Sequence, residues 1–386
     1  MKTPERKPGE ALGIRVGDFV ENSIERQIIH SKKEAPYLQG EPEPHVWYRV
    51  AVPEGITGDG SEYYIYLKKG NSQNLCVFLS GGGVAWNEYT AARPVTGGKV
   101  AAGLPNYYWN NLRPFTQIMN IRAGIMEDGN PRNPFDQWNF IIITYATGDF
   151  HVGNNDFPYE AEDGSQQILH FHGHGNFRAG MEAGAAYFPE ADKLLIAGDS
   201  AGAFAVPALT REILDDFYPK CRDITLLSDS GQLLYSKWRT TARDIWKTDA
   251  SIWKPLKGEN ITLDWYRELY RRRGDSLKYL YASSVRDYLL SAYYNDVANK
   301  VYKTDGEVQE IFRKQLRHMV HDLKKITPRF TVFLYDWKNL FLMRGGTVHT
   351  AVRHRRFYTK MDGISMARWL ADAAEGKLRD VGLELL

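Results

Sequence analysis

Hydrophobic positions along the chain form short continuous runs that are separated by longer amphipathic stretches. The apolar runs lie at residues 75–79, 140–145, 194–197, 224–227, 277–281 and 330–334. Continuous runs of this length are typical of central strands that are covered on both faces of a parallel sheet. The helical stretches between them lie at 175–187, 203–217 and 306–325. This alternation predicts an α/β protein with a mostly parallel, doubly wound sheet.

Three further segments complete the predicted organisation. Residues 47–52 and 62–67 are expected to pair antiparallel at one edge of the sheet, because a Gly-containing loop joins them. Residues 232–276 are rich in Trp, Lys and Arg and interrupt the alternation. We interpret them as a helical insertion above the carboxyl edge of the sheet, where ligands bind in such folds. Residues 1–44 are polar and are expected to wrap the surface, which leaves 45–386 as a single domain.

Composition narrows the functional classes. A chain of 386 residues that is 43% hydrophobic and 25% charged is typical of one large globular domain. Its net charge of +2 is too small for a general polyanion binder, so we expect no nucleic-acid partner. The polar N-terminus indicates no signal peptide, and no apolar stretch is long enough to span a bilayer. We expect a cytoplasmic protein in which Cys76 and Cys221 form no disulfide framework.

The most specific local motif is Gly-x-Ser-x-Gly at Gly198, Ser200 and Gly202, between an apolar run and a predicted helix. A sharp strand-to-helix turn of this kind lifts the serine hydroxyl above the sheet, and the flanking glycines relieve crowding. The N-terminus of the following helix also favours a developing oxyanion. The motif alone occurs by chance, but its position between a strand and a helix predicts that Ser200 is a nucleophile.

A second glycine-rich segment, Gly81 to Gly83, follows the apolar run 75–79. In α/β-hydrolases the oxyanion binds the N–H of the residue after the nucleophile, here Ala201, and an N–H of such a loop. The alternatives are a flexible turn and a phosphate loop. The fingerprints of dinucleotide-binding and Walker loops are both missing from this segment, so we expect no cofactor.

The catalytic histidine should follow Ser200 and come last in the triad. His349 is the preferred general base because it lies in a Gly-containing loop after the apolar residues 341–343. His354 is a second choice. His318 and His321 lie three residues apart in a helical stretch and fit surface or packing positions better.

The acid should follow a strand between the nucleophile and the histidine. Asp287 fits this place best, a few residues beyond the run 277–281. Asp229 and Asp336 also follow apolar runs and remain competitors at this point. The role of the acid would be to fix the tautomer of the histidine and to stabilise its charged form.

Taken in order, these segments resemble the pectin acetylesterase and Notum family of α/β-hydrolases. The matching segments are the triple glycine at 79–85, then 145–149, the elbow at 198–202, Leu-Ser-Asp-Ser-Gly at 227–231, and then 282–287, 346–350 and the tail at 364–370. The resemblance implies hydrolysis of an O-linked acyl ester by a triad, with backbone oxyanion donors. The residues so implied are Ser200, His349 and Asp287 for the triad and Gly82, Gly83 and Ala201 for the oxyanion. Asp229 falls in a segment that the family does not use for its acid.

The departures from the family also carry information. Plant and animal members have a signal peptide and many disulfides, and we expect neither in this chain. Val84 replaces the Trp that follows the glycines, with Trp86 two residues later, while Thr347 and Thr350 replace the cysteines that flank the histidine. These differences predict a prokaryotic, intracellular, disulfide-free member.

Three other groups of residues are candidates for binding. Trp86, Asp149 and His151 are placed near the mouth of the active site, although loop structure explains Asp149 and His151 equally well. Alternating histidines at 170, 172 and 174 could bind zinc from one face of a strand. The segment resembles the family's loop that leads into a helix, and no acidic or cysteine partner lies at ligand spacing, so we expect no metal. The basic residues 353–356 could bind an anionic substrate, but a surface patch is the preferred interpretation.

Together these observations predict a serine carboxylic-ester hydrolase, similar to an esterase or O-deacetylase, that acts on a small-molecule or glycan ester through an acyl-enzyme. An acyltransferase, a lactonase or a polyester depolymerase would use the same triad. A catalytically inactive binding protein with the hydrolase fold is the alternative from a different class.

Overall fold

The central feature of the computed structural model is one large sheet, and the structure describes residues 12–17, 34–338 and 345–386. Within these residues, eight strands lie in the order β1-β2-β4-β3-β7-β8-β9-β10. They are β1 (Trp47–Ile56), β2 (Glu62–Lys68), β3 (Leu75–Leu79), β4 (Asn139–Ile143), β7 (Lys193–Asp199), β8 (Asp223–Asp229), β9 (Lys278–Ser284) and β10 (Thr331–Tyr335). β2 pairs antiparallel with β1 and β4, and every neighbouring pair from β4 to β10 is parallel. The predicted α/β class and mostly parallel sheet are confirmed.

The central strands are buried along their whole length, which explains their continuous apolar sequence. Every residue of β3, β4 and β10 is buried. A strand that is covered on both faces has no solvated side, so the alternation typical of surface strands disappears. Each predicted run coincides with an observed strand to within a few residues.

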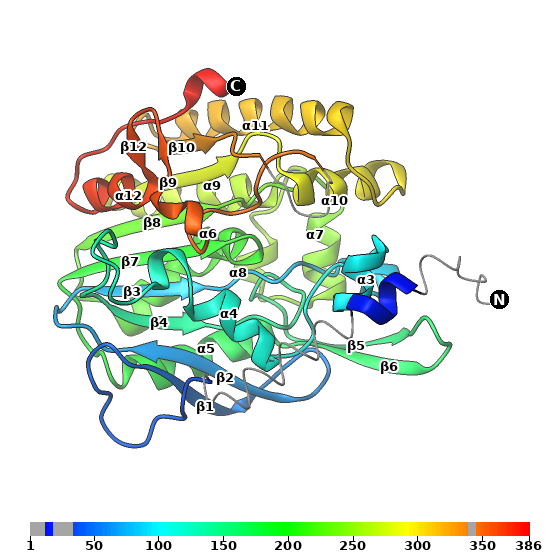
Figure 1. Cartoon of the computed structure of the whole chain (residues 1–386), viewed down its shortest axis with the longest axis horizontal. Coiled ribbons are helices and arrows are strands. Elements are labelled where there is room, and N and C mark those ends of the chain that lie inside the picture. Colours follow the sequence, from blue (N-terminus) through cyan, green and yellow to red (C-terminus); the bar gives the residue numbers. More distant parts are fainter. Residues whose placement is uncertain (1–11, 18–33, 339–344) are drawn as a thin grey trace.

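Helices cover both faces of the sheet (Figure 1). On one face, a continuous apolar core joins the sheet to α5 (Gly173–Ala185), α6 (Ala201–Glu212), α9 (Ile261–Arg273), α10 (Tyr288–Asn299) and α11 (Gly306–Ile326). On the other face, a second core joins it to α4 (Pro114–Ile121), η1 (Gly124–Met126), η6 (Arg355–Tyr358) and α12 (Met366–Ala374). The shorter helices are α2 (Glu88–Ala91), α3 (Gly97–Ala102), α7 (Trp238–Thr240) and α8 (Ala250–Trp253). The short helical turns are η2 (Ile213–Phe217), η3 (Thr241–Ile245), η4 (Gly274–Ser276) and η7 (Leu383–Leu385).

Two small hairpins lie outside the central sheet. β5 (Asn155–Glu160) pairs with β6 (Gln166–Phe171), and β11 (Lys360–Met361) pairs with β12 (Ile364–Ser365). The β5–β6 hairpin extends beyond the end of the central sheet (Figure 1). Its second strand replaces the loop that we expected before α5. The sequence there, Gln-Gln-Ile-Leu-His-Phe, alternates only over its last three residues and gave little signal for that strand.

The predicted insertion at 232–276 is helical and has two parts. In the first part, Trp246 reaches the glycine-rich loop, because its indole Nε1 donates to the carbonyl oxygen of Ala85 at 2.8 Å. Trp238 and Trp246 also pack against Phe150. In the second part, α9 packs beside α6 and α11 on one face of the sheet. The insertion therefore reaches the glycine-rich loop through its first part and packs on one face of the sheet through its second part.

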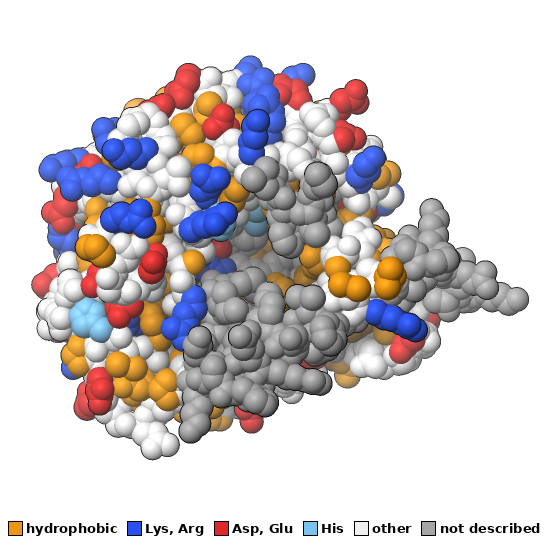
Figure 2. All heavy atoms as spheres, viewed as in Figure 1, with side chains coloured by type: hydrophobic (Ala, Val, Ile, Leu, Met, Phe, Trp, Pro, Cys, Tyr) orange, Lys and Arg blue, Asp and Glu red, His pale blue; other side chains and the backbone are white. Residues whose placement is uncertain are grey.

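The remaining sequence expectations concern the termini, the cysteines and the surface. Most of residues 1–44 and the apolar residues 341–343 lie outside the described residues. Cys76 and Cys221 are buried and unpaired, as a disulfide-free relative requires. No described helix has both the length and the apolar character needed to cross a bilayer. Lys and Arg side chains are interspersed with Asp and Glu on the face drawn in Figure 2.

Candidate active site

Ser200 stands alone between the end of β7 and the start of α6, in the sharp turn that the sequence predicts. Its φ of 49° and ψ of −122° belong to a region that non-glycine residues rarely adopt. Ser230, at the end of β8, and Thr350, beside His349, also have positive φ. Strained backbone of this kind persists where the surrounding structure holds it, and it clusters at functional sites.

The glycines of the elbow are required by close backbone approach. A Cβ added at Gly202 would lie 1.8 Å from the carbonyl oxygen of Leu79, and one at Gly198 would lie 2.4 Å from that of Gly202. Any side chain at either position would push the elbow away from β3. The motif therefore encodes the contact between the nucleophile and the strand that leads to the glycine-rich loop.

The glycine-rich loop lies directly against the elbow. A Cβ added at Gly81 would fall 2.8 Å from the Cβ of Ser200, and the Gly81 N–H donates to Asp199 Oδ1 at 2.9 Å. Gly83 has a φ of 85° and its carbonyl oxygen accepts from the Tyr145 hydroxyl at 3.0 Å. Among the described residues, no protein acceptor is bonded to the N–H of Gly82, Gly83 or Ala201. These three donors remain available to a ligand beside Ser200.

His349 is held by Asp287. Its Nδ1 lies 2.7 Å from Asp287 Oδ2, while Asp287 Oδ1 accepts from the N–H groups of Leu289 and Leu290 and so caps α10. Burial opposes the charged ring, but the negative charge and hydrogen bond of Asp287 raise the pKa of His349 above its usual value. The other ring nitrogen, Nε2, is buried and has no hydrogen-bond partner among the described residues. Such an orphaned nitrogen is free to accept a proton.

Backbone pairing joins the histidine loop to the loop that follows β9. Thr347 N–H donates to the Arg286 carbonyl oxygen at 2.9 Å, and the Arg286 N–H donates to Thr347 Oγ1 at 3.0 Å. Asp287 and Thr347 form an isolated parallel bridge. The contact between Asp287 and His349 is therefore set by main-chain pairing as well as by the side chains.

The other two candidate acids, Asp336 and Asp229, lie in different environments. Asp336 is exposed. Asp229 is buried, and its Oδ2 accepts from the N–H groups of Ala351 and Val352 at 2.6 and 2.8 Å, which fastens the chain just beyond His349. Burial raises the pKa of Asp229 to about 6, although these two hydrogen bonds lower it. Asp229 thus anchors the backbone that follows His349 through these two hydrogen bonds.

The titration of Asp229 predicts a pH dependence of stability. Its folded pKa of about 6 exceeds the unfolded value of 3.8, so its contribution is fully present below pH 3.8 and is lost as the pH rises through 6. Asp229→Asn keeps an acceptor but no longer titrates. We expect the unfolding free energy of the wild type to fall relative to this variant by on the order of 3 kcal/mol between pH 4 and pH 7. Urea denaturation of both proteins at several pH values measures the difference, and a constant difference would contradict the prediction.

Arg353 connects the elbow, β3 and the histidine loop. Its guanidinium contacts both oxygens of Asp199, at 2.7 and 3.0 Å, and Nη1 donates to Asn120 Oδ1 at 3.0 Å. Ser80 Oγ donates to the same Asn120 oxygen at 2.7 Å. The side chains of Arg353 and Asp199 are only 9% and 5% exposed. The residue directly before the nucleophile is therefore fixed by a buried bidentate ion pair.

Removing the guanidinium of Arg353 should lower the stability of the folded protein. We expect Arg353→Met to lower the free energy of unfolding by about 3–5 kcal/mol, because the buried charge of Asp199 is left without an opposite charge. The double variant Asp199→Asn/Arg353→Met should recover part of the loss. Urea denaturation measures both, with the exposed Arg355→Met as the matched control. Equal effects at 353 and 355 would show that the pair is unimportant.

The basic run 353–356 was interpreted from the sequence as a surface patch or an anion site. Arg353 is instead engaged in the buried pair described above. His354 Nδ1 accepts from the Arg356 N–H at 3.1 Å and caps η6, so its ring has a local structural contact. The sequence signal for the role of Arg353 was indirect, since only Asp199, inside the elbow motif, marks its partner.

The predicted lining residues are buried around the site. Trp86 is 1% exposed and packs with Tyr107, Tyr235 and Tyr293. Asp149 accepts hydrogen bonds from Thr147 Oγ1 and from two backbone N–H groups.

His151 supports the glycine-rich loop from beneath. Its Nε2 lies 2.8 Å from the Ser80 carbonyl oxygen. Burial lowers the pKa of His151 to about 4, so a neutral ring donates this bond near neutral pH. The observed role of His151 is therefore to hold the backbone just before the glycine-rich loop.

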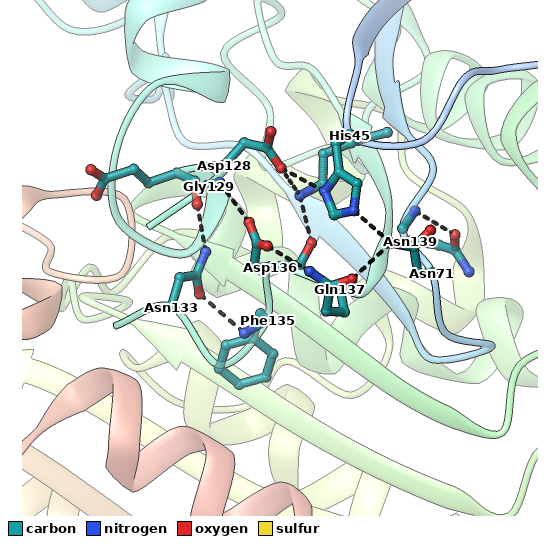
Figure 3. Close-up of polar contacts among 12 residues, drawn as sticks. His45, Asn71, Asp128, Gly129, Asn133, Phe135, Asp136, Gln137 and Asn139 are labelled. Carbon is teal, nitrogen blue, oxygen red and sulfur yellow. Dashed lines mark hydrogen bonds and ion pairs between the residues drawn. The ribbon is translucent and has the colours of Figure 1, made fainter. Parts of the chain in front are cut away.

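Two clusters of histidine and carboxylate lie away from this site. One contains Asp156, His170 and His172 on the β5–β6 hairpin. The sequence gave no sign of Asp156 as a partner, because strand pairing alone places it opposite His170. The other contains His45, Asp128 and Asp136 and is drawn in Figure 3.

The sequence was compared with models of known protein families. The family model for pectinacetylesterase matches residues 50–268. That range contains the glycine-rich loop and Ser200 and ends before Asp287 and His349. No curated protein shows significant sequence similarity to the chain.

Proposed function

Because this chain belongs to the pectinacetylesterase family and is thereby a carboxylic-ester hydrolase, we propose that it is a serine esterase whose triad is Ser200, His349 and Asp287. The substrate we propose is an O-acyl ester, acetyl first, of a small molecule or a glycan. The observation that carries the proposal is the orphaned Nε2 of His349, on a ring whose Nδ1 is bonded to a buried aspartate.

The first half of the reaction forms an acyl-enzyme. His349 Nε2 takes the proton from Ser200 Oγ as the oxygen attacks the ester carbonyl carbon. The negative charge on the carbonyl oxygen is stabilised by the N–H groups of Gly82, Gly83 and Ala201, and one such donor is worth about 3–4 kcal/mol in the transition state. Collapse of the tetrahedral intermediate breaks the bond to the alcohol, which leaves with the proton from His349.

The second half repeats these steps with water as the nucleophile. His349 takes a proton from water, the resulting oxygen attacks the acyl carbon, and Ser200 Oγ leaves with the proton. Asp287 accepts a hydrogen bond from Nδ1–H, which leaves Nε2 unprotonated at the start of each half, and it stabilises the imidazolium that forms. The raised pKa of His349 makes the ring a stronger base.

Covalent labelling tests this assignment. A fluorophosphonate should add once to the protein, and peptide mass spectrometry should locate the adduct on Ser200. Hydrolysis rates for p-nitrophenyl esters from acetyl to palmitoyl then define the acyl group. An unlabelled protein that is folded, or an adduct on another serine, would overturn the proposal.

A further inference from the structure

Two histidines and one aspartate converge on the β5–β6 hairpin. His170 Nδ1 and His172 Nε2 lie 2.6 and 2.9 Å from the same oxygen, Asp156 Oδ1. His170 lies in β6, opposite Asp156 of β5, and His172 follows two residues later on the same side of the chain. The three side chains are 22%, 34% and 59% exposed for His170, His172 and Asp156, so solvent ions can reach them.

We propose that Asp156, His170 and His172 form a binding site for a divalent transition-metal ion, with Zn²⁺ as the first candidate. Two imidazoles and one carboxylate suit zinc, cobalt, nickel and copper, whereas magnesium and calcium prefer oxygen ligands alone. Three protein ligands leave at least one position for water.

The geometry needs only a small adjustment to accept the ion. Ligand atoms around a tetrahedral Zn²⁺ with bonds of about 2.0–2.1 Å lie roughly 3.3 Å apart, so the present separations must widen by about 0.5 Å. Asp156 is the most exposed of the three and can move by this distance. Each neutral ring coordinates through the nitrogen that now faces Asp156, once its proton resides on the other ring nitrogen.

The second cluster, of His45, Asp128 and Asp136, differs from the hairpin site because its groups already have other partners. In Figure 3, His45 uses Nδ1 for Asp128 Oδ1, at 3.1 Å, and Nε2 for the amide of Asn71, at 2.8 Å. The ammonium of buried Lys68 lies 3.1 Å from that Asp128 oxygen and supplies the positive charge. Both oxygens of Asp136 accept N–H groups. Among the described residues no Lys or Arg forms an ion pair with Asp156, which contacts the two histidines instead.

A bound ion would fasten several elements together. It would join β5 to β6 and to the start of α5, since His172 immediately precedes Gly173. The same hairpin contacts the helical insertion, where the Asn154 N–H donates to the Trp246 carbonyl oxygen at 2.8 Å and Asn155 Nδ2 donates to that of Ile245 at 2.7 Å. Metal binding should therefore stabilise the folded protein.

Titration of the chelator-treated protein with ZnCl₂ in a calorimeter tests the site. We expect one equivalent to bind and the melting temperature to rise with zinc, while MgCl₂ has no such effect. Co²⁺ should give visible absorption bands on binding. Ser200→Ala should bind zinc as the wild type does, so the outcome is independent of the proposed esterase activity.

Variants locate the ion. His170→Gln, His172→Gln and Asp156→Asn should each weaken zinc binding by at least about tenfold, since loss of a mere supporting residue already costs that much. The matched controls are His174→Gln and His45→Gln, which should bind zinc as the wild type does. In the wild type the ring of His174 pairs with Glu212. Circular dichroism in the presence of chelator verifies folding. Absence of saturable zinc binding in the wild type, or equal affinity in the variants and controls, would overturn the proposal.

Discussion

Ser200→Ala is expected to lower kcat for p-nitrophenyl acetate by roughly 10⁴- to 10⁶-fold. Without Oγ no acyl-enzyme forms, so only water positioned by His349 and the oxyanion donors can react. The residual rate should remain above that of the uncatalysed reaction, because the N–H groups of Gly82, Gly83 and Ala201 are backbone donors that the substitution leaves in place. Initial rates measured under substrate saturation give the comparison.

The control for this variant is another serine. Ser276→Ala changes an exposed hydroxyl at the end of η4 and should retain full activity. Thermal melts of both variants distinguish loss of chemistry from loss of fold. A folded Ser200→Ala protein with activity within tenfold of the wild type would refute the proposed nucleophile.

Asp287→Asn is expected to lower kcat by about 10⁴-fold, since an amide that donates to Nδ1 leaves the proton on Nε2, where it blocks general base catalysis. The asparagine oxygen can still accept from the N–H groups of Leu289 and Leu290, so the cap of α10 should survive. Asp287 also raises the pKa of His349. Its loss should therefore lower that pKa and move the acid limb of the kcat/KM profile to lower pH.

The other two candidate acids provide matched comparisons. Asp336→Asn alters an exposed carboxylate and should leave kcat unchanged. Asp229→Asn should act on stability and on the position of the loop, with a smaller loss of kcat and no downward shift of the acid limb comparable to that of Asp287→Asn. A deeper loss of kcat in Asp229→Asn than in Asp287→Asn would reassign the acid.

Much of the fold could be predicted from local sequence. The central strands of the sheet can be recognised as continuous apolar runs because they are buried on both faces. These strands are β3, β4 and β7 to β10. The turn at Ser200 was predictable for a similar reason. Its strand, its glycines and its helix are contiguous, and the close approaches of Gly198 and Gly202 demand residues without a Cβ.

The β5–β6 hairpin shows where local pattern was insufficient. The run at 166–171 does not alternate strictly, and residues 170–174 were interpreted as a loop because they resemble the family's loop that leads into a helix. Its pairing partner lies upstream and carries a proline at position 158. The approach of Asp156 to His170 and His172 depends on the register of that pair, which no single strand specifies.

The acid of the candidate triad likewise depends on contacts that local sequence does not specify. Asp229 ends a parallel strand, and Asp287 and Asp336 follow two others, so sequence position places all three near the carboxyl edge. The pairing of Thr347 with Arg286 helps to bring His349 to Asp287, while Asp229 accepts hydrogen bonds from the backbone of Ala351 and Val352. Likewise, the ion pair between Arg353 and Asp199 joins residues 154 positions apart.

The sequence by itself thus determined the α/β class, the central strands and the serine turn, because backbone conformation and burial are encoded by neighbouring residues. The tertiary structure alone decided which carboxylate meets which histidine or arginine. Those contacts depend on the order of strands and the register of loops, and the cost of a buried unpaired charge is evident only once the chain has folded around it.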